Sequence, residues 1–410
     1  MNEIIEIEKP ATTKAAANTS FADILQNHAT PLYVFDLAKL KNRVAYFRSV
    51  LPESVEICYA MKANPFVVKP LSEQVDYLEI CSPGELKICQ NLSVDESKFI
   101  ISGIYKAEKD IAELIGSSKH VAAYTVESLG QFRLLRTAAQ HYNKKIKVLL
   151  RLSSKNQFGI DRADLTKLIA DFANDEWIEI AGLQYFSGTQ KSSIKKIARE
   201  CALLDDYLTE LKETYNFTMP KLEFGPGFPV AYFEGEQFDE ESYMSALAEL
   251  LKNMHYAGPI TLEIGRSLTA TCGTYFTRVV DMKQNCSENY AIVDGGMHQI
   301  VYYGHFMAMK HPRFSLLPPR SEGEKKTWHI CGSLCTMNDF LAKQVELIDL
   351  KVGDILAFEN AGAYCMTEGM SLFLSRDLPE IILLNEDKTC TVVRKPLATG
   401  EFNTPHYEKE

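Results

Sequence analysis

The sequence predicts a (β/α)8 barrel followed by a mainly β domain. Between residues 56 and 268, eight short apolar runs alternate with amphipathic stretches of helical periodicity. After about residue 275 strand-like runs continue, but few helical stretches separate them. A chain of 410 residues also exceeds the usual size of a single core, which favours two domains.

Each of the eight runs has the length of a buried strand and is followed by a helix-like segment, which is the pattern of a (β/α)8 barrel. Between residues 194 and 212, for example, Ile197, Cys201, Leu204 and Leu208 recur at the spacing of one helix face. The predicted barrel strands are 56–62, 75–82, 98–103, 121–126, 145–153, 178–187, 221–227 and 260–268.

Six further runs predict the strands of the second domain: 275–283, 290–295, 327–335, 354–364, 380–384 and 389–394. Residues 31–36 are also strand-like and belong either to this domain or to a bridge between the two. Because residues 8–20 are polar and alanine-rich, we expect a mobile leader over residues 1–28. The barrel is then expected over 29–274 and the β domain over 275–410.

Composition narrows the class of protein. With 46% hydrophobic and 24% charged residues, the chain is typical of a soluble globular protein, and its net charge of −10 disfavours nucleic acid or an anionic membrane as partner. No apolar run approaches the ~20 residues of a membrane span. The acidic start lacks the basic region of a secretory signal, and ten cysteines are too sparse for a disulfide scaffold, so we expect a cytoplasmic protein.

Metal binding is not expected. Cys331 and Cys335, with His329 nearby, come closest to a zinc pattern, but no second cysteine pair with zinc-like spacing accompanies them.

In a (β/α)8 barrel, functional side chains gather where the strands end. The ends of the predicted strands carry a lysine, acids, an arginine and several Gly/Ser/Thr turns, a set that suits a phosphorylated ligand. They are Lys62, Glu79, Ser82, Glu85, Arg151, and residues 187–190, 225–227 and 263–266.

Lys62 is the most informative of these residues. At the end of an apolar strand its amine points into the barrel mouth, where partial desolvation lowers its pKa and favours attack on a carbonyl. Taken alone, such a lysine is more often one that extends its amine to solvent. Its neighbours in the sequence decide between the two interpretations.

Six ordered motifs carry a family resemblance: Tyr-Ala-Met-Lys-Ala-Asn-Pro at 59–65, Leu-Glu-Ile-Cys-Ser-Pro-Gly-Glu-Leu at 78–86, Gln-Phe-Gly-Ile at 157–160, Glu-Ile-Gly-Arg at 263–266, Cys-Thr-Met-Asn-Asp at 335–339, and Gly-Ala-Tyr at 362–364. The chain resembles, over about residues 30–385, the fold-type-III decarboxylases that use pyridoxal 5'-phosphate (PLP). These are the ornithine, diaminopimelate and arginine decarboxylases, related to alanine racemase. The resemblance implies a homodimer whose active sites combine one barrel with the partner's β domain.

The resemblance also implies roles for single residues. Lys62 would bind PLP as a Schiff base, and Glu263 would pair with the pyridine nitrogen and make the ring a strong electron sink. Cys335 would protonate the substrate after CO2 has left, and Asp339 would fix the loop that carries it. Arg151 and Glu79 would support the ring, although an ion pair inside the barrel is an equal alternative for both. The phosphate site resembles that of the family at Thr189, Gly225, Gly227, Gly265, Arg266 and Tyr364.

Two departures from the family pattern affect the cofactor site. Phe186 stands where a histidine usually stacks on the cofactor ring, and phenylalanine can stack but cannot donate a hydrogen bond. The usual triple-glycine turn is Gly225-Pro-Gly227, in which Pro226 removes one backbone donor. The phosphate grip must therefore depend on neighbouring groups.

A third departure concerns the substrate. Thr336 follows Cys335, where ornithine- and diaminopimelate-type enzymes carry an acid that receives the distal amino group. Because a buried ammonium without a counter-charge costs several kcal/mol, we expect a substrate without a free distal amine. Thr336 and Asp339 are the expected substrate-side residues. The pattern looks more like the branch that decarboxylates amino acids linked to citrate or to a carrier protein in siderophore and natural-product synthesis.

Three alternatives stay open at this point. Racemases of this fold usually place an arginine opposite the pyridine nitrogen, so Glu263 favours decarboxylation. A decarboxylase of a free diamino acid is the second alternative. A non-catalytic binding or regulatory subunit is the third, and the joint presence of Lys62, Glu263 and Cys335 argues against it.

Overall fold

The computed structural model describes residues 21–117 and 120–407 of the 410-residue chain. These residues divide into two compact units. The barrel unit consists of Lys41–Val230 and Phe238–Leu268. The sheet unit consists of the described residues within 1–40, 231–237 and 269–410.

The predicted (β/α)8 barrel is confirmed. Its eight strands are all parallel and follow the order of the chain around a closed sheet, in which the first strand pairs with the last through Val55↔Ile260 to Tyr59↔Ile264. The strands are β2 (Val55–Ala60), β3 (Tyr77–Ile80), β4 (Phe99–Ile101), β5 (Ala123–Val126), β6 (Ile146–Arg151), β7 (Ile178–Phe186), β8 (Leu222–Gly225) and β9 (Ile260–Ile264).

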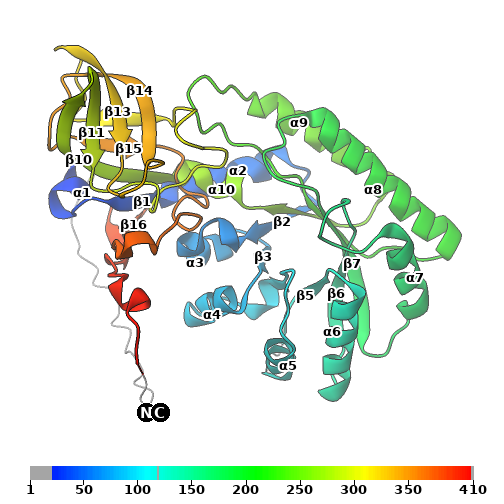
Figure 1. Ribbon diagram of the computed structural model, residues 1–410. Coiled ribbons are helices and arrows are strands. Elements are labelled where there is room, and N and C mark those ends of the chain that lie inside the picture. Colours follow the sequence, from blue (N-terminus) through cyan, green and yellow to red (C-terminus); the bar gives the residue numbers. More distant parts are fainter. Residues whose placement is uncertain (1–20, 118–119, 408–410) are drawn as a thin grey trace. The chain divides into compact units, whose positions relative to one another are not determined.

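A helix follows each barrel strand, and Figure 1 shows the helices α3–α9 on the outer side of the strands. In the longest helix, α8, Ile197, Cys201, Leu204 and Leu208 are buried, as their spacing predicts. The helices of this unit are α2 (Leu37–Val50), α3 (Val68–Ser72), α4 (Pro83–Asn91), α5 (Glu108–Ser117), α6 (Leu129–His141), α7 (Arg162–Phe172), α8 (Ile194–Tyr215), α9 (Glu240–Lys252) and α10 (Arg266–Thr269).

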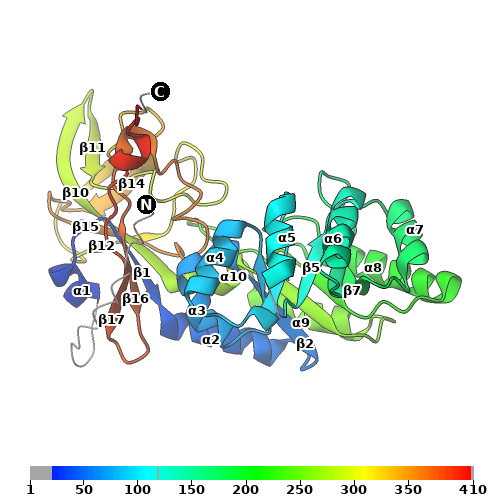
Figure 2. The same cartoon turned by 90° about the horizontal axis from the view of Figure 1, so that it is seen from below.

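The sheet unit is built on one nine-stranded sheet with the main order β14-β13-β11-β10-β1-β16-β17, while β12 and β15 pair with each other beside β10. Figure 2 shows β10 beside β11, and β16 beside β17, as antiparallel pairs. The strands are β1 (Leu32–Asp36), β10 (Gly273–Asn285), β11 (Glu288–Val293), β12 (Phe314–Leu317), β13 (Lys325–Cys331), β14 (Phe340–Ile348), β15 (Ile355–Phe358), β16 (Glu380–Leu384) and β17 (Cys390–Arg394).

The boundaries differ from the expected ones at the N-terminal side. Residues 1–20 of the expected leader lie outside the described residues, but Phe21–Asn27 form helix α1. β1 follows within the range expected for the barrel, yet it pairs with β10 and β16 of the sheet unit. The barrel is already closed without this strand, which pairs on both of its edges within the sheet unit.

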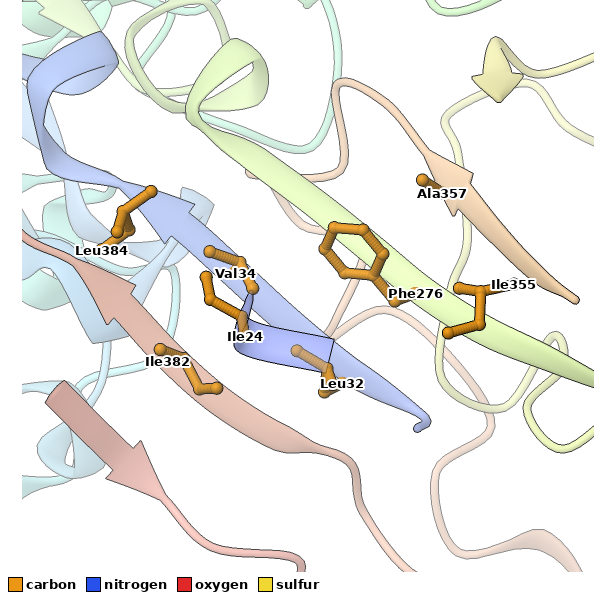
Figure 3. Packing of buried hydrophobic residues seen from close by; sticks show 8 residues of the cluster. All are labelled: Ile24, Leu32, Val34, Phe276, Ile355, Ala357, Ile382 and Leu384. Atoms are coloured by element: carbon orange, nitrogen blue, oxygen red, sulfur yellow. The ribbon is translucent and has the colours of Figure 1, made fainter. Parts of the chain in front are cut away.

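A cluster of buried apolar side chains explains this assignment (Figure 3). Ile24 of α1 packs in one cluster with alternate residues of β1, β10, β15 and β16, which share a sheet face because strand side chains alternate. Burying one such side chain contributes about 1.5–3 kcal/mol, which holds the N-terminal segment on the sheet. The cluster is Ile24, Leu32, Val34, Phe276, Ile355, Ala357, Ile382 and Leu384.

Two strands, β12 and β14, were not predicted. β12 is a four-residue run between Pro312 and Pro318 and is too short to show a periodicity. In β14 the apolar residues Leu341, Val345 and Ile348 recur at a helix-like spacing, and Gln344 has a positive φ of 53° that interrupts the alternation of a regular strand.

Several predicted strands end earlier than expected, and two of these differences affect candidate site residues. β13 ends at Cys331 and β15 at Phe358, so Cys335 and Tyr364 lie in the loops that follow. Across the described parts of the chain, helices that combine the length and hydropathy of a bilayer span are absent.

Candidate active site

Lys62 lies in a short 3-10 turn, Met61–Ala63, directly after β2. Because β2 pairs with β3 on one side and β9 on the other, the acids that end these strands reach the same amine. The Nζ atom of Lys62 forms an ion pair with Glu79 of β3 and lies 3.2 Å from Oε1 of Glu263 of β9. The Sγ atom of Cys81 is 3.9 Å from the same nitrogen. The barrel thus brings together the lysine and both acids that the sequence singled out.

The two carboxyls differ in their electrostatic state. Both are buried, and burial favours their protonated forms. At Glu79 the opposing attraction and hydrogen bond of Lys62 outweigh burial and lower the pKa. At Glu263 burial, followed by repulsion from Glu79, raises the pKa to about 7. Glu79 is therefore the ionised partner of the lysine, and Glu263 can hold a proton near neutral pH.

Glu263 is also fixed from its other side. Nε2 of Gln184, on β7, donates a hydrogen bond of 3.0 Å to Oε2 of Glu263. Gln184 was not among the predicted site residues, although it lies two residues before Phe186 and therefore on the same side of the strand. The two bonds, from Lys62 and Gln184, hold the carboxyl in one orientation.

Glu223, on β8, is a third buried acid of the barrel and was also not predicted as a site residue. Among the described residues, neither of its carboxyl oxygens has a hydrogen-bond partner. Burial, together with repulsion from Glu263 and Glu79, raises its pKa well above the usual value. Burial and the two neighbouring acids therefore favour the protonated form of Glu223.

Arg151 forms the ion pair that the sequence left as an alternative. Its Nη1 atom lies 2.9 Å from Oε1 of Glu127, and both residues are buried at the ends of neighbouring strands. The guanidinium also lies over the ring of Phe158, 4.8 Å from the ring centroid. Arg151 and Glu127 thus form a buried ion pair in the same barrel as Lys62.

The loops after β7, β8 and β9 are joined to one another. The N–H of Lys191 donates to the carbonyl of Gly227 over 2.9 Å, and Gln190 exchanges two hydrogen bonds with the backbone of Val230. Nε of Arg266 lies 3.3 Å from Oγ1 of Thr189. The barrel-unit residues expected at the phosphate site therefore lie on loops that contact one another, and Tyr364 belongs to the sheet unit.

The glycines of this rim are required by the backbone. Gly227 has a φ of +62°, and a Cβ atom there would overlap the carbonyl oxygen of Gly188. A Cβ atom on Gly225 would overlap the half-buried ring of Phe186. Gly265, on the third loop, lies against the side chains of Ala60 and Ala63. At Gly225 and Gly227 the loops approach one another so closely that only glycine fits.

In the sheet unit, Asp339 organises the loop of residues 332–339. The side chain is 3% exposed, and its two carboxylate oxygens accept hydrogen bonds of 2.8 Å from the N–H groups of Met297 and Leu334. Burial raises its pKa despite these bonds. The carboxylate of Asp339, which was expected on the substrate side, therefore ties its own loop to the backbone of Met297. In this loop Cys335 is exposed and Thr336 is half-buried.

Tyr364 lies in the loop that follows β15. Its φ is +65°, and its carbonyl accepts hydrogen bonds from the N–H groups of Thr367 and Glu368. The side chain is half-buried. The turn thus fixes the backbone of the Gly-Ala-Tyr motif.

The barrel rim has the chemistry that an aldehyde cofactor with a phosphate group needs. An amine for imine formation lies beside an acid that can hold a proton, and three adjoining loops offer backbone donors and an arginine. These features define a PLP-type site. The chain belongs to the family described as pyridoxal-dependent decarboxylase, C-terminal sheet domain, which matches residues 32–362.

Curated relatives and solved structures agree with this assignment. Diaminopimelate decarboxylase of Aquifex aeolicus is 29% identical over 365 residues, 84% of this chain and 84% of that protein. The Staphylococcus aureus decarboxylase of 2-[(L-alanin-3-ylcarbamoyl)methyl]-2-hydroxybutanedioate is 25% identical over 388 residues, 88% of this chain and 96% of that protein. The crystal structure of diaminopimelate decarboxylase from Helicobacter pylori complexed with L-lysine has the same fold, with a TM-score of 0.82 and 22% identity over 93% of this chain and 98% of that one.

The chain is therefore a PLP-dependent amino acid decarboxylase, a carboxy-lyase, and PLP is its cofactor. This activity separates it from the racemases and from the non-catalytic subunits that the sequence left open.

Proposed function

We propose that this decarboxylase acts on an amino acid that carries carboxylates, and no free amine, at its far end. A citrate conjugate has this character, and a carrier-linked amino acid shares with it the absence of a free distal amine. The observation that carries the proposal is the loop of residues 332–339, whose only acidic side chain, Asp339, is committed to Met297 and Leu334. Thr336 offers a hydroxyl where a distal ammonium would need a negative charge.

A cation that is hydrogen-bonded to the same loop supports a negatively charged substrate. Nη2 of Arg376 donates a hydrogen bond of 2.9 Å to the carbonyl of Ser333, two residues before Cys335. The guanidinium has five N–H donors in a fork that suits carboxylates. The exposed position of Arg376 leaves it accessible to a ligand.

The S. aureus relative supports the same substrate class. Its substrate name describes an alanine whose side chain is joined through a carbamoyl group to a hydroxybutanedioate, so an amide stands where a diamino acid has its distal amine. A free diamino acid is the second candidate, because the A. aeolicus relative is a diaminopimelate decarboxylase.

The catalytic roles follow from the side chains of the rim. When bound, PLP supplies an electron sink for the pair released as CO2 leaves. Lys62 would hold the cofactor covalently until the substrate amine replaces it, and Glu263 would keep a proton at the pyridine nitrogen. Phe186 would cover one face of the cofactor ring, and Arg151, held by its buried ion pair with Glu127, would support the ring. Cys335 would return a proton to the α-carbon. The phosphate would be held by Thr189, Gly225, Gly227, Gly265, Arg266 and Tyr364.

The proposal also includes a homodimer and a cytoplasmic location. Exposed apolar side chains on loops of the sheet unit, among them Phe306, Met309, Met337 and Phe373, favour a homodimer in which each barrel is completed by the partner's Cys335 loop. All ten cysteines are free thiols, as expected for a cytoplasmic protein.

Substrate competition tests the proposal. We expect CO2 release from 2,3-diaminopropionate amide-linked to citrate to have a kcat/KM at least about tenfold above that of lysine, ornithine or diaminopimelate. Borohydride reduction followed by peptide mapping should place the cofactor on Lys62. A preference for diaminopimelate would overturn the substrate class, and a cofactor fixed elsewhere would overturn the catalytic assignment.

A further inference from the structure

A buried lysine lies in the loop after β7, next to the loop after β8. Lys191 is only 7% exposed. Its Nζ atom is 2.7 Å from Oε2 of Glu200, on α8, and 3.0 Å from Oγ of Ser187. Ser187 also donates a hydrogen bond to Glu200, so the three side chains form a closed triangle.

The backbone of Lys191 belongs to the same loop junction. Its N–H donates to the carbonyl of Gly227 over 2.9 Å, and its carbonyl accepts a 2.9 Å hydrogen bond from the hydroxyl of Tyr243 on α9. The side chain lies against the glycine turn: its Cε atom is 3.0 Å from the position that a Cβ atom on Gly227 would take. The cation is therefore next to the turn in which Pro226 lacks an N–H donor.

We propose that Lys191 is the buried counter-charge of the cofactor phosphate and compensates for the donor missing at Pro226. The proposal rests on the phosphate lying at the loops after β7 and β8, as in the proposed function. Glu200 and Ser187 act as positioning residues, because they hold the amine under Gly227.

Electrostatics support this role. Burial lowers the pKa of Lys191, and Glu200 offsets this effect only in part. A dianion placed above the turn would stabilise the protonated amine. Because an ion pair that is shielded from water is screened little, the attraction extends across the thin glycine turn without direct contact.

Paired cofactor titrations test the proposal. Cofactor-free protein is titrated with PLP and, separately, with pyridoxal, which has the same aldehyde and ring but no phosphate, and binding is followed by imine absorbance. For Lys191→Met we expect a Kd for PLP raised about tenfold or more and a Kd for pyridoxal within about twofold of wild type. Lys191→Arg, which keeps the charge, should retain most of the PLP affinity. Lys195→Met, on the exposed face of α8, is the matched control.

A double variant makes the compensation measurable. Pro226→Gly restores a backbone donor, so the loss of PLP affinity caused by Lys191→Met should be smaller in that background than in wild type. Equal losses for PLP and pyridoxal would show a merely structural role and overturn the proposal, as would an unchanged PLP affinity. Wild-type protein that binds PLP at Lys62 in those same titrations would leave the proposed function standing.

Discussion

At the scale of single residues, the site depends on how two buried carboxyls share one lysine. Glu79 takes the ion pair, while Glu263, held by Lys62 and Gln184, keeps a raised pKa. The pair therefore separates a permanent negative charge from a group that can carry a proton. A protonated pyridine nitrogen needs a carboxylate, which Glu263 becomes when it gives its proton to the ring, and a lysine that must stay in place needs a permanent charge such as that of Glu79.

The raised pKa of Glu263 predicts a pH-dependent stability. With a pKa of about 7 in the folded protein and about 4.3 unfolded, the folded state binds more protons between these values, so this residue's contribution to stability falls as pH rises from 5 to 7. The change is at most about 3 kcal/mol. We expect urea unfolding of the cofactor-free protein to show that the free energy of unfolding of wild type, relative to that of Glu263→Gln, falls as pH rises from 5 to 7. Glu249→Gln, on the exposed side of α9, is the control, and a pH-independent difference would contradict the prediction.

Thr336 predicts the substrate preference at the level of one side chain. Thr336→Asp places a carboxylate where a distal ammonium would bind, so we expect kcat/KM for lysine or ornithine to rise about tenfold while the carboxylate-bearing substrate loses activity. Thr336→Asn has nearly the same size without the charge and should not show this exchange. If both variants behave alike, charge at this position does not set the specificity. Steady-state CO2 release measures both arms.

At the scale of elements, the glycine turn after β8 predicts a cofactor effect. Gly227→Ala must place a Cβ atom against the carbonyl of Gly188 in addition to adopting a φ of +62°. Gly235 has a φ of +76° with open space around it, so Gly235→Ala isolates the backbone cost of about 1 kcal/mol. We expect thermal denaturation to show a larger loss for Gly227→Ala, and PLP affinity to fall only in that variant. Equal effects of the two would contradict the turn's role.

The periodicity of the sequence was sufficient to predict the barrel but not to predict every residue of the candidate site. All eight barrel strands were predicted, since buried parallel strands followed by amphipathic helices give strong signals. β14 was missed because its apolar residues recur at a helix-like spacing. Gln184, Glu127 and Lys191 were missed for a different reason. Gln184 and Glu127 pair with residues of other barrel strands, which only the folded barrel brings close, and Lys191 reaches Glu200 only through the path of the loop before α8.

At the scale of the whole molecule, both ends of the chain build the sheet unit. β1 lies between β10 and β16, which follow it by more than two hundred residues, and α1 contributes Ile24 to the shared core. The barrel unit is therefore inserted within the sheet unit in the chain order. Neither unit carries the proposed catalytic set alone, because Lys62 and Glu263 belong to the barrel unit and Cys335 to the sheet unit.

If each active site of a dimer combines Lys62 of one chain with Cys335 of the other, two inactive variants should complement each other. Lys62→Ala and Cys335→Ala should each abolish most activity as homodimers. After mixing under conditions that exchange subunits, a heterodimer would hold one site with both Lys62 and Cys335 intact. Random mixing makes half of the dimers heterodimers, so we expect recovery of about a quarter of wild-type activity. Lys62→Ala mixed with Glu263→Gln is the matched control, because both residues belong to the same barrel and no site is restored. If neither mixture recovers activity although exchange is shown by mass spectrometry, Cys335 acts within its own chain or not at all.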